Sequence, residues 1–440
     1  MGFERIWHKS YAAEVPPAIE LERITMAEAL RRSAGRFPDR TAFHYLGRKI
    51  SFRELESLVN RFTRALAALG VRAGDKVATL LPNLPQHVIA NHACYRLGAV
   101  TVMNNPLYTE RELEAQLNDS DARFLITLDL LLPRALKIKA ATKIETIIPC
   151  HINDYLPFPT RQLIPYLKKE LHRKVVPGPG FLPGVPTIFM GLLNREAFRK
   201  MDLSFIKRFF TGAAPLAPDT AKQLQALTGK GICDVYGLTE NTAFATCIPW
   251  KGKAKPDTVG VPLPNTDLKI VDLEKGMREL PAGEAGEICI KGPQLMTGYY
   301  KKSEETANAL RDGWLYTGDI GFLDEDGHLS VVDRKKDMII AGGYNVYPKE
   351  IDEVLFDHPK ILEACAVGVP DEYRGETIKA FVVVKPGESL TEAEIIEYCR
   401  ERLAAYKAPK RIAFLDTLPK SAAGKILRRE LRVLEAQKEG

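Results

Sequence analysis

Apolar residues in the first third of the chain recur at two different spacings. Between positions 51 and 70 they fall three or four residues apart, which predicts an amphipathic helix. Ser51 and Glu54 form a capping-box pattern at its start, and Gly70 is a typical stop signal. Shorter apolar runs, bounded by Pro, Asn or Gly, predict strands. After the first helix, strands are predicted at 75–81, 99–103 and 124–127. A helix is predicted at 86–97, and a capped helix start at 109–112.

This alternation of strands and helices predicts the architecture of the N-terminal part. Strand–helix–strand units are right-handed and build parallel sheets, so we expect an α/β fold with a large N-terminal domain of parallel α/β sheets. From about residue 260 short strands are separated by Gly, Asp and Pro turns, which predicts a β-rich subdomain. Its strands are expected at 287–291, 298–300 and 328–332.

A third pattern begins after Asp333. A hairpin is predicted at 338–347, and helix, strand, strand and helix follow it to the end of the chain. This order predicts a small α+β C-terminal domain, which the resemblance described below implies to be mobile. We therefore divide the chain into an N-terminal domain over 1–332, a hinge over 333–337 and a C-terminal domain over 338–440.

Composition places the chain among globular proteins. Its 440 residues are too many for one ordinary core and suggest two or three domains. Apolar residues make up 45% and charged residues 27%, which argues against disorder. The formal net charge of +6 is spread along the chain. It fits anionic small ligands or lipid headgroups, and gives no support for nucleic-acid binding.

The 7 cysteines are far apart and include no C-x-x-C pair, which predicts reduced thiols rather than disulfides or a zinc site. The N-terminus has no apolar stretch typical of a signal peptide, and no apolar run is long enough to span a bilayer. We expect a cytoplasmic protein. The basic amphipathic stretch 164–176 can lie on an anionic membrane surface, which would make the protein membrane-peripheral, or can be a solvated helix face.

One candidate nucleotide motif follows the strand predicted at 231–235. In Tyr236-Gly237-Leu238-Thr239-Glu240 the ring can stack on a base, the hydroxyl can contact a phosphate and the carboxylate can hold Mg²⁺ at a helix start. The alternative is an ordinary strand-to-helix turn.

Three further segments have the same ambiguity. Tyr316-Thr317-Gly318-Asp319 places a carboxylate after a tight turn, as in sites that accept from ribose hydroxyls, although Gly-Asp is also common turn chemistry. The segment 333–351 is either a charged linker with a glycine hairpin or a hinge that aims Arg334 at a nucleotide. The segment 419–426 places a lysine on a loop, but it is not a Walker loop because Ile426 replaces Ser or Thr.

In this order and spacing, the four segments together resemble the AMP-forming acyl-CoA synthetases, within the adenylate-forming enzymes. The resemblance includes 212–216 and 286–293 and extends to Arg429. It is closest to the long-chain fatty acid–CoA ligases, a branch that 154–159 and the basic stretch 164–176 favour.

The resemblance implies a reaction in two steps. A fatty carboxylate attacks the α-phosphate of ATP to give an acyl-adenylate and pyrophosphate, and coenzyme A then displaces AMP after the C-terminal domain rotates. The catalytic residues implied are Lys425 on the reacting oxygens, Thr239 on phosphate and Glu240 as the Mg²⁺ ligand. The cofactor-binding residues implied are Gly212, Ala213, Ala214, Tyr236 and Gly237 around adenine, Asp319 and Arg334 on the ribose, Lys336 at the hinge, and Gly342 and Gly343 near the pantetheine arm.

The sequence departs from this family at one place. Members carry a loop rich in Gly, Ser and Thr whose N–H groups hold the β- and γ-phosphates, but no glycine occurs here between Gly98 and Gly178. The family pattern stops near Val176 and resumes at Phe181, so we interpret the N-terminal domain as internally truncated near 175–182. Loss of several preorganised donors, each worth about 3 kcal/mol, predicts adenylation slower by about 10⁴-fold or more.

Three hypotheses follow from this departure. The chain is a long-chain fatty acid–CoA ligase with impaired activity, or a non-catalytic remnant that binds acyl-adenylate or CoA. The third possibility is a faulty gene model or a deletion allele with no stable product. A dehydrogenase has no support, since no G-x-G-x-x-G follows a strand.

Overall fold

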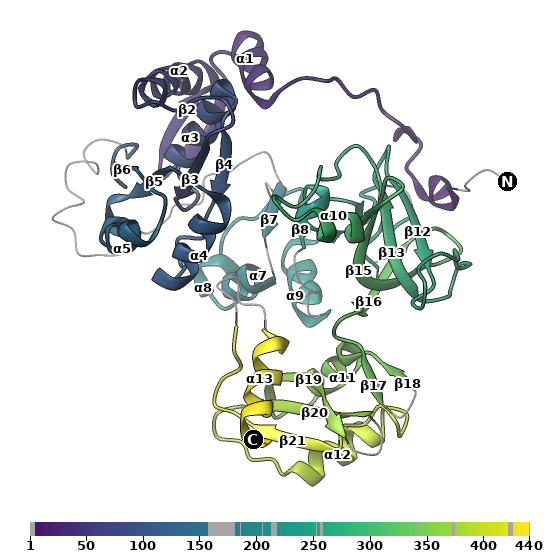
Figure 1. Cartoon of the computed structure of the whole chain (residues 1–440). Coiled ribbons are helices and arrows are strands. Elements are labelled where there is room, and N and C mark those ends of the chain that lie inside the picture. Colours follow the sequence, from purple (N-terminus) through teal and green to yellow (C-terminus); the bar gives the residue numbers. More distant parts are fainter. Residues whose placement is uncertain are drawn as a thin grey trace. The chain divides into compact units, whose positions relative to one another are not determined.

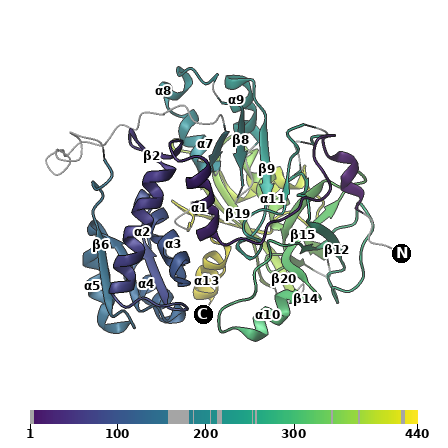
Figure 2. The ribbon, with the colours of Figure 1, turned by 90° about the horizontal axis from the view of Figure 1, so that it is seen from above.

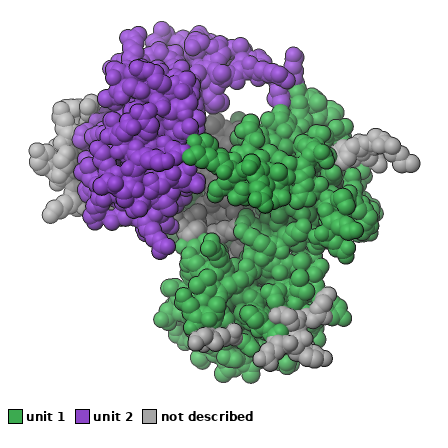
Figure 3. Space-filling view, in the orientation of Figure 1, with its two compact units in different colours: residues 1–19, 178–440 green, residues 20–177 purple. Residues whose placement is uncertain are grey.

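The computed structural model describes most of the chain in two compact units. It describes residues 5–439 with the exception of 157–180, 185, 205, 213–217, 252, 256–257, 342–343, 372–374 and 421–425. One unit comprises residues 20–177, and the other comprises residues 1–19 and 178–440, as coloured in Figure 3. The basic stretch 164–176 lies outside the described residues.

The unit formed by residues 20–177 is built on a parallel four-stranded sheet in the order β4-β3-β5-β6. Every residue of β5 is buried, as expected for a strand of a parallel sheet covered on both faces. Figure 1 shows helices packed around these strands. The strands are β3 (Lys76–Leu80), β4 (Val100–Met103), β5 (Phe124–Leu128) and β6 (Thr146–Cys150), and a separate antiparallel pair is formed by β1 (Thr41–Tyr45) and β2 (Arg48–Ser51).

Two helices of this unit, α2 and α4, begin at the predicted caps, although only one capping box is complete. At the start of α4 the Thr109 hydroxyl accepts from the Glu112 N–H, and the Glu112 carboxylate accepts from the Thr109 N–H. Ser51 also caps α2, but the Glu54 carboxylate pairs with Arg48. In Figure 2, α2 and α3 lie beside each other. The helices are α1 (Met26–Arg36), α2 (Phe52–Ala68), α3 (Pro85–Leu97), α4 (Glu110–Ser120) and α5 (Leu132–Ile138), with 3-10 turns η2 (Asp129–Leu131) and η3 (Lys139–Ala141).

The second unit contains a five-stranded sheet in the order β11-β10-β9-β8-β7. The strands β7, β8 and β9 are parallel, whereas β10 and β11 join the sheet antiparallel. Among the described strands, β7 therefore ends this sheet. Its elements are β7 (Phe181–Gly184), β8 (Arg208–Thr211), β9 (Ile232–Tyr236), β10 (Thr246–Cys247), β11 (Val261–Pro262), α7 (Pro186–Leu193), α8 (Glu196–Arg199), α9 (Pro218–Thr228) and the 3-10 turns η1 (Ile6–Ser10) and η5 (Thr239–Asn241).

A second sheet of this unit has the order β12-β13-β15-β14, and β16 pairs with β15. The strand predicted at 298–300 is absent. Gly298 has a φ of +151°, and the Tyr299 N–H donates to the Thr306 hydroxyl instead of to a neighbouring strand. The elements are β12 (Asp267–Val271), β13 (Gly286–Lys291), α10 (Ser303–Ala309), β14 (Leu310–Arg311), β15 (Trp314–Leu323) and β16 (Leu329–Arg334).

The last sheet has the order β18-β17-β20-β19, with β21 parallel to β20. The hairpin predicted at 338–347 is confirmed by the antiparallel pairing of β17 with β18. The sequence did not predict β21, which is a short strand with only one fully buried residue. The hinge predicted at 333–337 and the domain limits predicted at 1–332 and 338–440 stay predictions. The elements are β17 (Ile339–Ala341), β18 (Tyr344–Val346), α11 (Pro348–Phe356), β19 (Ile361–Asp371), β20 (Gly375–Val384), α12 (Glu392–Arg400), β21 (Arg411–Phe414) and α13 (Arg428–Glu439).

No helix in the described part of the chain is long and apolar enough to cross a bilayer.

Candidate active site

Two of the sequence motifs meet through one hydrogen bond. Tyr236 is the last residue of β9, and its phenol donates to the Asp319 carboxylate of β15 over 2.8 Å. Burial, followed by the charge of Asp319, holds the pKa of Tyr236 well above its ordinary value. Tyr236 therefore stays a neutral donor at physiological pH, and its ring is fixed beside the carboxylate.

Arg334 completes this arrangement from the neighbouring strand. Asp319 on β15 and Arg334 on β16 are register partners, and the Arg334 Nε lies 3.3 Å from an Asp319 carboxylate oxygen. The carboxylate of Asp319 is 8% exposed, whereas the side chain of Arg334 is 41% exposed. A buried carboxylate beside a more exposed guanidinium can accept from hydroxyl groups and still place a cation near an anionic ligand.

The turn before Asp319 is held by Glu287, which was not among the predicted site residues. Gly318 has a φ of +70°, a conformation that favours glycine, and its N–H donates to the Glu287 carboxylate over 3.1 Å. The second oxygen of Glu287 accepts from the Lys335 ammonium over 2.9 Å. Glu287 therefore ties the Asp319 turn to the segment that carries Arg334.

The loop between β9 and β10, residues 237–245, carries the remaining residues of the first motif and is called the nucleotide loop below. A Cβ atom at Gly237 would lie 2.2 Å from the Ala243 carbonyl oxygen, so only glycine fits this close backbone approach. Thr239 is exposed and starts the turn η5. The predicted helix start is wrong, because η5 covers only three residues.

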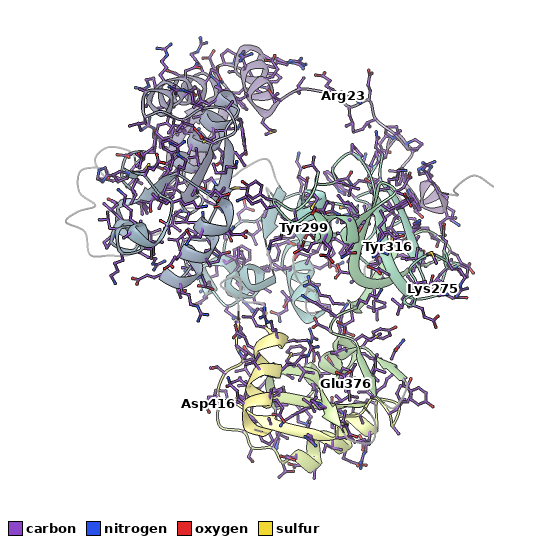
Figure 4. The ribbon with its side chains drawn as sticks, in the orientation of Figure 1. Arg23, Lys275, Tyr299, Tyr316, Glu376 and Asp416 are labelled. Atoms are coloured by element: carbon purple, nitrogen blue, oxygen red, sulfur yellow. The ribbon has the colours of Figure 1, made fainter. Side chains whose placement is uncertain are left out.

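Glu240 is held by Tyr299, which was not among the predicted site residues. The Tyr299 phenol donates to the Glu240 carboxylate over 2.8 Å, and the Met296 N–H donates to the Glu240 carbonyl over 2.7 Å. Tyr299 is labelled in Figure 4. Burial, together with the bond to Glu240, raises the pKa of Tyr299 to about 12. The two residues are 59 positions apart in the sequence, so no local pattern reveals this contact.

Glu240 fits the role of a Mg²⁺ ligand in one respect. The described residues contain no group of three His, Cys, Asp or Glu side chains that could hold a metal by themselves. Magnesium is commonly bound by one or two carboxylates together with substrate phosphates, so a single carboxylate on the nucleotide loop meets this requirement.

Gly212 lies next to the end of β9. A Cβ atom at Gly212 would lie 2.7 Å from the Val235 side chain and 3.0 Å from its carbonyl oxygen. The structure therefore brings Gly212 to the strand that ends at Tyr236. Ala213 and Ala214 lie outside the described residues.

The other predicted site residues belong to the C-terminal part. Lys336 is exposed in a turn where the Asp337 and Met338 N–H groups donate to the Arg334 carbonyl. Gly342 and Gly343, between β17 and β18, and Lys425 lie outside the described residues.

The ends of the loop that carries Lys425 are described. Lys420 and Ile426 form a β-bridge, and the Leu427 N–H donates to the Pro419 carbonyl over 2.9 Å. Both ends of this loop are therefore held close together.

Known proteins share this arrangement of segments. The sequence pattern of the family described as AMP-binding enzyme matches residues 30–179 and 177–300, and that of the AMP-binding enzyme C-terminal domain matches residues 350–425. The chain belongs to the AMP-binding enzyme family. In this AMP-binding enzyme, the contacts of Asp319 with Tyr236 and Arg334 bring together three of the four segments on which the resemblance rests.

A curated relative refines the placement of this AMP-binding enzyme. The chain is 34% identical to a long-chain-fatty-acid–CoA ligase of Bacillus subtilis (strain 168), and the alignment covers 100% of this chain and 99% of the relative. The alignment has 558 positions, which is 118 more than the chain has residues. The chain is an AMP-forming acyl-CoA ligase by family.

Solved structures confirm the expected α/β fold. ATP-bound MatB from Rhodopseudomonas palustris matches with a TM-score of 0.80 at 26% identity, covering 93% of this chain and 99% of that one. The anthranilate CoA ligase AuaEII in complex with anthranoyl-AMP matches with a TM-score of 0.79 at 25% identity, covering 97% of this chain and 99% of that one. The anthranilate CoA ligase and the long-chain-fatty-acid–CoA ligase differ in their acids, so the fold does not specify the acid.

Proposed function

We propose that this chain is a long-chain fatty acid–CoA ligase by descent, with an impaired adenylation step. The observation that carries the proposal is the hydrogen bond from Tyr236 to Asp319, because it joins two motifs expected to hold one nucleotide. The long-chain acid is supported by the name of the Bacillus subtilis relative. The substrates are then a fatty acid, ATP and coenzyme A.

In the proposed reaction the fatty carboxylate attacks the α-phosphate of ATP, and the thiol of coenzyme A then displaces AMP. Two steps are needed because a carboxylate is a poor electrophile, and adenylation supplies a good leaving group. Asp319 accepts from the ribose hydroxyls, with Tyr236 and Arg334 fixing its carboxylate. Thr239 contacts phosphate, and Lys425 bridges the reacting oxygens as an electrostatic and positioning group.

Three other features of the site have proposed roles. Glu240 holds Mg²⁺, which when bound neutralises phosphate charge. Gly212, with Ala213 and Ala214, forms one wall of the adenine slot. Gly342 and Gly343 approach the pantetheine arm of coenzyme A.

The proposed impairment is an internal truncation near residues 175–182. Three observations support it. The alignment to the Bacillus subtilis relative has 118 more positions than the chain has residues. The family pattern matches in two segments that meet at 177–179. No glycine occurs between Gly98 and Gly178 that could form a phosphate-binding loop.

The truncation predicts a specific defect. Backbone N–H donors to the β- and γ-phosphates would be missing, while the groups around adenine and ribose remain. Each donor is worth about 3 kcal/mol in the transition state, so adenylation falls by about 10⁴-fold or more. Binding of AMP should change far less, since AMP lacks both of these phosphates.

The alternative is a non-catalytic remnant that binds acyl-adenylate or CoA. The Tyr236, Asp319 and Arg334 group favours it, since these contacts need no β- or γ-phosphate.

The cytoplasmic location stays a prediction from the cysteine spacing, and the membrane contact through 164–176 stays a prediction from the charge pattern.

ATP–pyrophosphate exchange with a mixture of fatty acids tests the proposal, beside Lys425→Ala and calorimetric titration with AMP. Weak exchange that disappears in Lys425→Ala, together with AMP binding, supports an impaired ligase. AMP binding without exchange supports the remnant. Exchange as fast as that of the Bacillus subtilis relative would contradict the truncation, and a chain that neither binds AMP nor melts cooperatively would contradict both functions.

A further inference from the structure

Two cysteines that are 14 positions apart in the sequence lie together on neighbouring strands. Cys233 is on β9 and Cys247 on β10, which is antiparallel to it. Cys247 is the register partner of Val235, and residues two apart on a strand share a face, so both thiols project from the same face of the sheet. The two thiols interact with each other, and the Cys247 Sγ donates to the Ile248 carbonyl over 3.4 Å. Both are free thiols, and Cys247 is the more exposed of the two.

A cation lies beside this pair. Arg208 on β8 places its positive charge near the Cys233 sulfur. Its Nη2 donates to the Trp250 carbonyl over 3.1 Å, and its buried Nε has no well-aligned partner among the described residues. A desolvated guanidinium nitrogen beside a thiol favours the anionic form of the sulfur.

The seven cysteines differ in how their surroundings affect ionisation. Burial raises the pKa of Cys94, Cys289 and Cys365 to about 12 in each case. The pKa of Cys233 is instead lowered, first by its interaction with Cys247 and then by Arg208. The same interaction raises the pKa of Cys247. Cys233 is therefore the thiol of the pair that ionises more readily, and Cys247 the one that stays protonated.

The pair also closes the base of the nucleotide loop. The chain leaves β9 after Tyr236, runs through residues 237–245, and enters β10 at Thr246. Backbone bonds hold this base, from the Ala245 N–H to the Tyr236 carbonyl over 2.8 Å and from the Ile248 N–H to the Asp234 carbonyl over 3.0 Å. A covalent link between the two sulfurs would fix the two ends of the loop that carries Thr239 and Glu240.

We propose that Cys233 and Cys247 form a dithiol oxidation site that reacts with a hydroperoxide and closes a disulfide across the base of the nucleotide loop. The Cys233 thiolate attacks the peroxide oxygen, the O–O bond breaks, and a sulfenic acid and hydroxide form. The Cys247 thiol then attacks the Cys233 sulfur, the S–O bond breaks, and the hydroxyl group leaves as water with the thiol proton. Hydrogen peroxide gains the two electrons that the two thiols lose, and a dithiol reductant reverses the change.

The position of the pair predicts how oxidation affects the loop. Diagonal positions of antiparallel strands are about 7–8 Å apart, and relaxed disulfides join Cα atoms about 5.5–6 Å apart. Bond formation therefore draws β10 toward β9 and moves the end of the nucleotide loop. We expect this movement to weaken the binding of AMP. That expectation rests on the proposed function, whereas formation of the disulfide does not.

Peptide mapping of the full chain tests the disulfide directly. Both cysteines lie in the tryptic peptide 231–251, because no Lys or Arg occurs between Lys230 and Lys251. After brief treatment with hydrogen peroxide and alkylation, we expect this peptide to lack two hydrogens and both alkyl groups. Its thiols should disappear at least about tenfold faster than that of Cys365, and return with dithiothreitol. Equal oxidation of all cysteines, or alkylated Cys247 beside oxidised Cys233, would overturn the proposal.

Variants separate the attacking thiolate from the resolving thiol. In Cys247→Ser, oxidised Cys233 should remain a sulfenic acid that dimedone traps. Arg208→Gln should slow the oxidation of Cys233 about fivefold or more, whereas Lys207→Gln, at an exposed neighbour, should not. Unchanged oxidation in Arg208→Gln would overturn the assignment of Arg208. The wild-type peptide map needs no variant, so it decides the main proposal even where a variant fails to fold.

Calorimetric titration with AMP before and after oxidation tests the consequence for the loop. We expect the oxidised chain to bind AMP at least about fivefold more weakly, and dithiothreitol to restore the affinity. A complete disulfide with unchanged AMP affinity would overturn the effect on the loop. Failure of the reduced chain to bind AMP would count against the proposed function, while the peptide map would still decide the oxidation site.

Discussion

The phenol of Tyr236 donates a hydrogen bond to the carboxylate of Asp319, which lies 83 positions later in the chain. This bond links the β9 strand of one sheet to the β15 strand of another. Since Arg334 on β16 also contacts Asp319, three elements depend on one buried carboxylate. Loss of the tyrosine hydroxyl should therefore affect both stability and nucleotide binding.

Tyr236→Phe tests this dependence. The variant loses a hydrogen bond to a charged acceptor, so we expect the free energy of unfolding to fall by about 1.5–3 kcal/mol. AMP affinity should fall about tenfold, because Asp319 loses the donor that orients it. Tyr11→Phe is a matched control, since that phenol donates to the Pro262 carbonyl over 2.6 Å. Denaturant unfolding and calorimetry measure both effects, and equal losses of AMP affinity in the two variants would contradict the role of Tyr236.

Gly237→Ala tests the close backbone approach in the nucleotide loop. The new Cβ would lie 2.2 Å from the Ala243 carbonyl oxygen, so the loop must shift. We expect AMP affinity to fall about tenfold or more, with a loss of stability of about 1–3 kcal/mol. Gly35→Ala is the control, because nothing lies within 4 Å of that position in α1 and alanine favours helices. A Gly237→Ala variant that binds AMP normally would show that the loop is not at the nucleotide.

The sequence predicted the elements whose signals are local. The α4 capping box needs only Thr109 and Glu112, which are three residues apart. The strand predicted at 298–300 failed because Thr306, outside the segment, accepts from the Tyr299 N–H. Local composition cannot report such a partner.

The same difference between local signals and distant partners applies to the candidate site. Tyr236 and Asp319 belong to motifs that can be read in sequence, but the contact between Glu240 and Tyr299 depends on how two distant segments pack. The cysteine spacing suggested only isolated reduced thiols, because the hairpin that pairs Cys233 with Cys247 becomes visible only through the strand register.

Arg428→Met tests the ion pair between Arg428, which follows the loop that carries Lys425 in the sequence, and Asp352. The Arg428 guanidinium pairs with the Asp352 carboxylate, which also accepts from the Ala366 N–H over 2.6 Å. Burial raises the pKa of Asp352 to about 7 despite the opposing charge of Arg428. Removal of the arginine leaves a buried carboxylate unpaired, so we expect a loss of about 3 kcal/mol at pH 8.

The pH dependence of this loss is diagnostic. Without Arg428 the pKa of Asp352 should rise further, so the carboxyl group is neutral at pH 5 and most of the loss should disappear there. Asp352→Asn combined with Arg428→Met should recover part of the stability at pH 8. Unfolding measured at both pH values checks this, and an equal loss at pH 5 and pH 8 would point to lost packing instead.

Asp234→Asn should stabilise the protein increasingly as the pH rises from the unfolded pKa of Asp234 to its folded pKa. Burial raises the pKa of Asp234 from 3.8 to about 6. Between these values the folded chain keeps a proton that the unfolded chain releases, so the contribution of Asp234 to stability falls as the pH rises. The full cost is at most about 3 kcal/mol, and partial exposure reduces it to about 1–2 kcal/mol. Unfolding from pH 4 to pH 7 should therefore show wild type and variant diverging with rising pH, and a constant difference would assign the effect to packing.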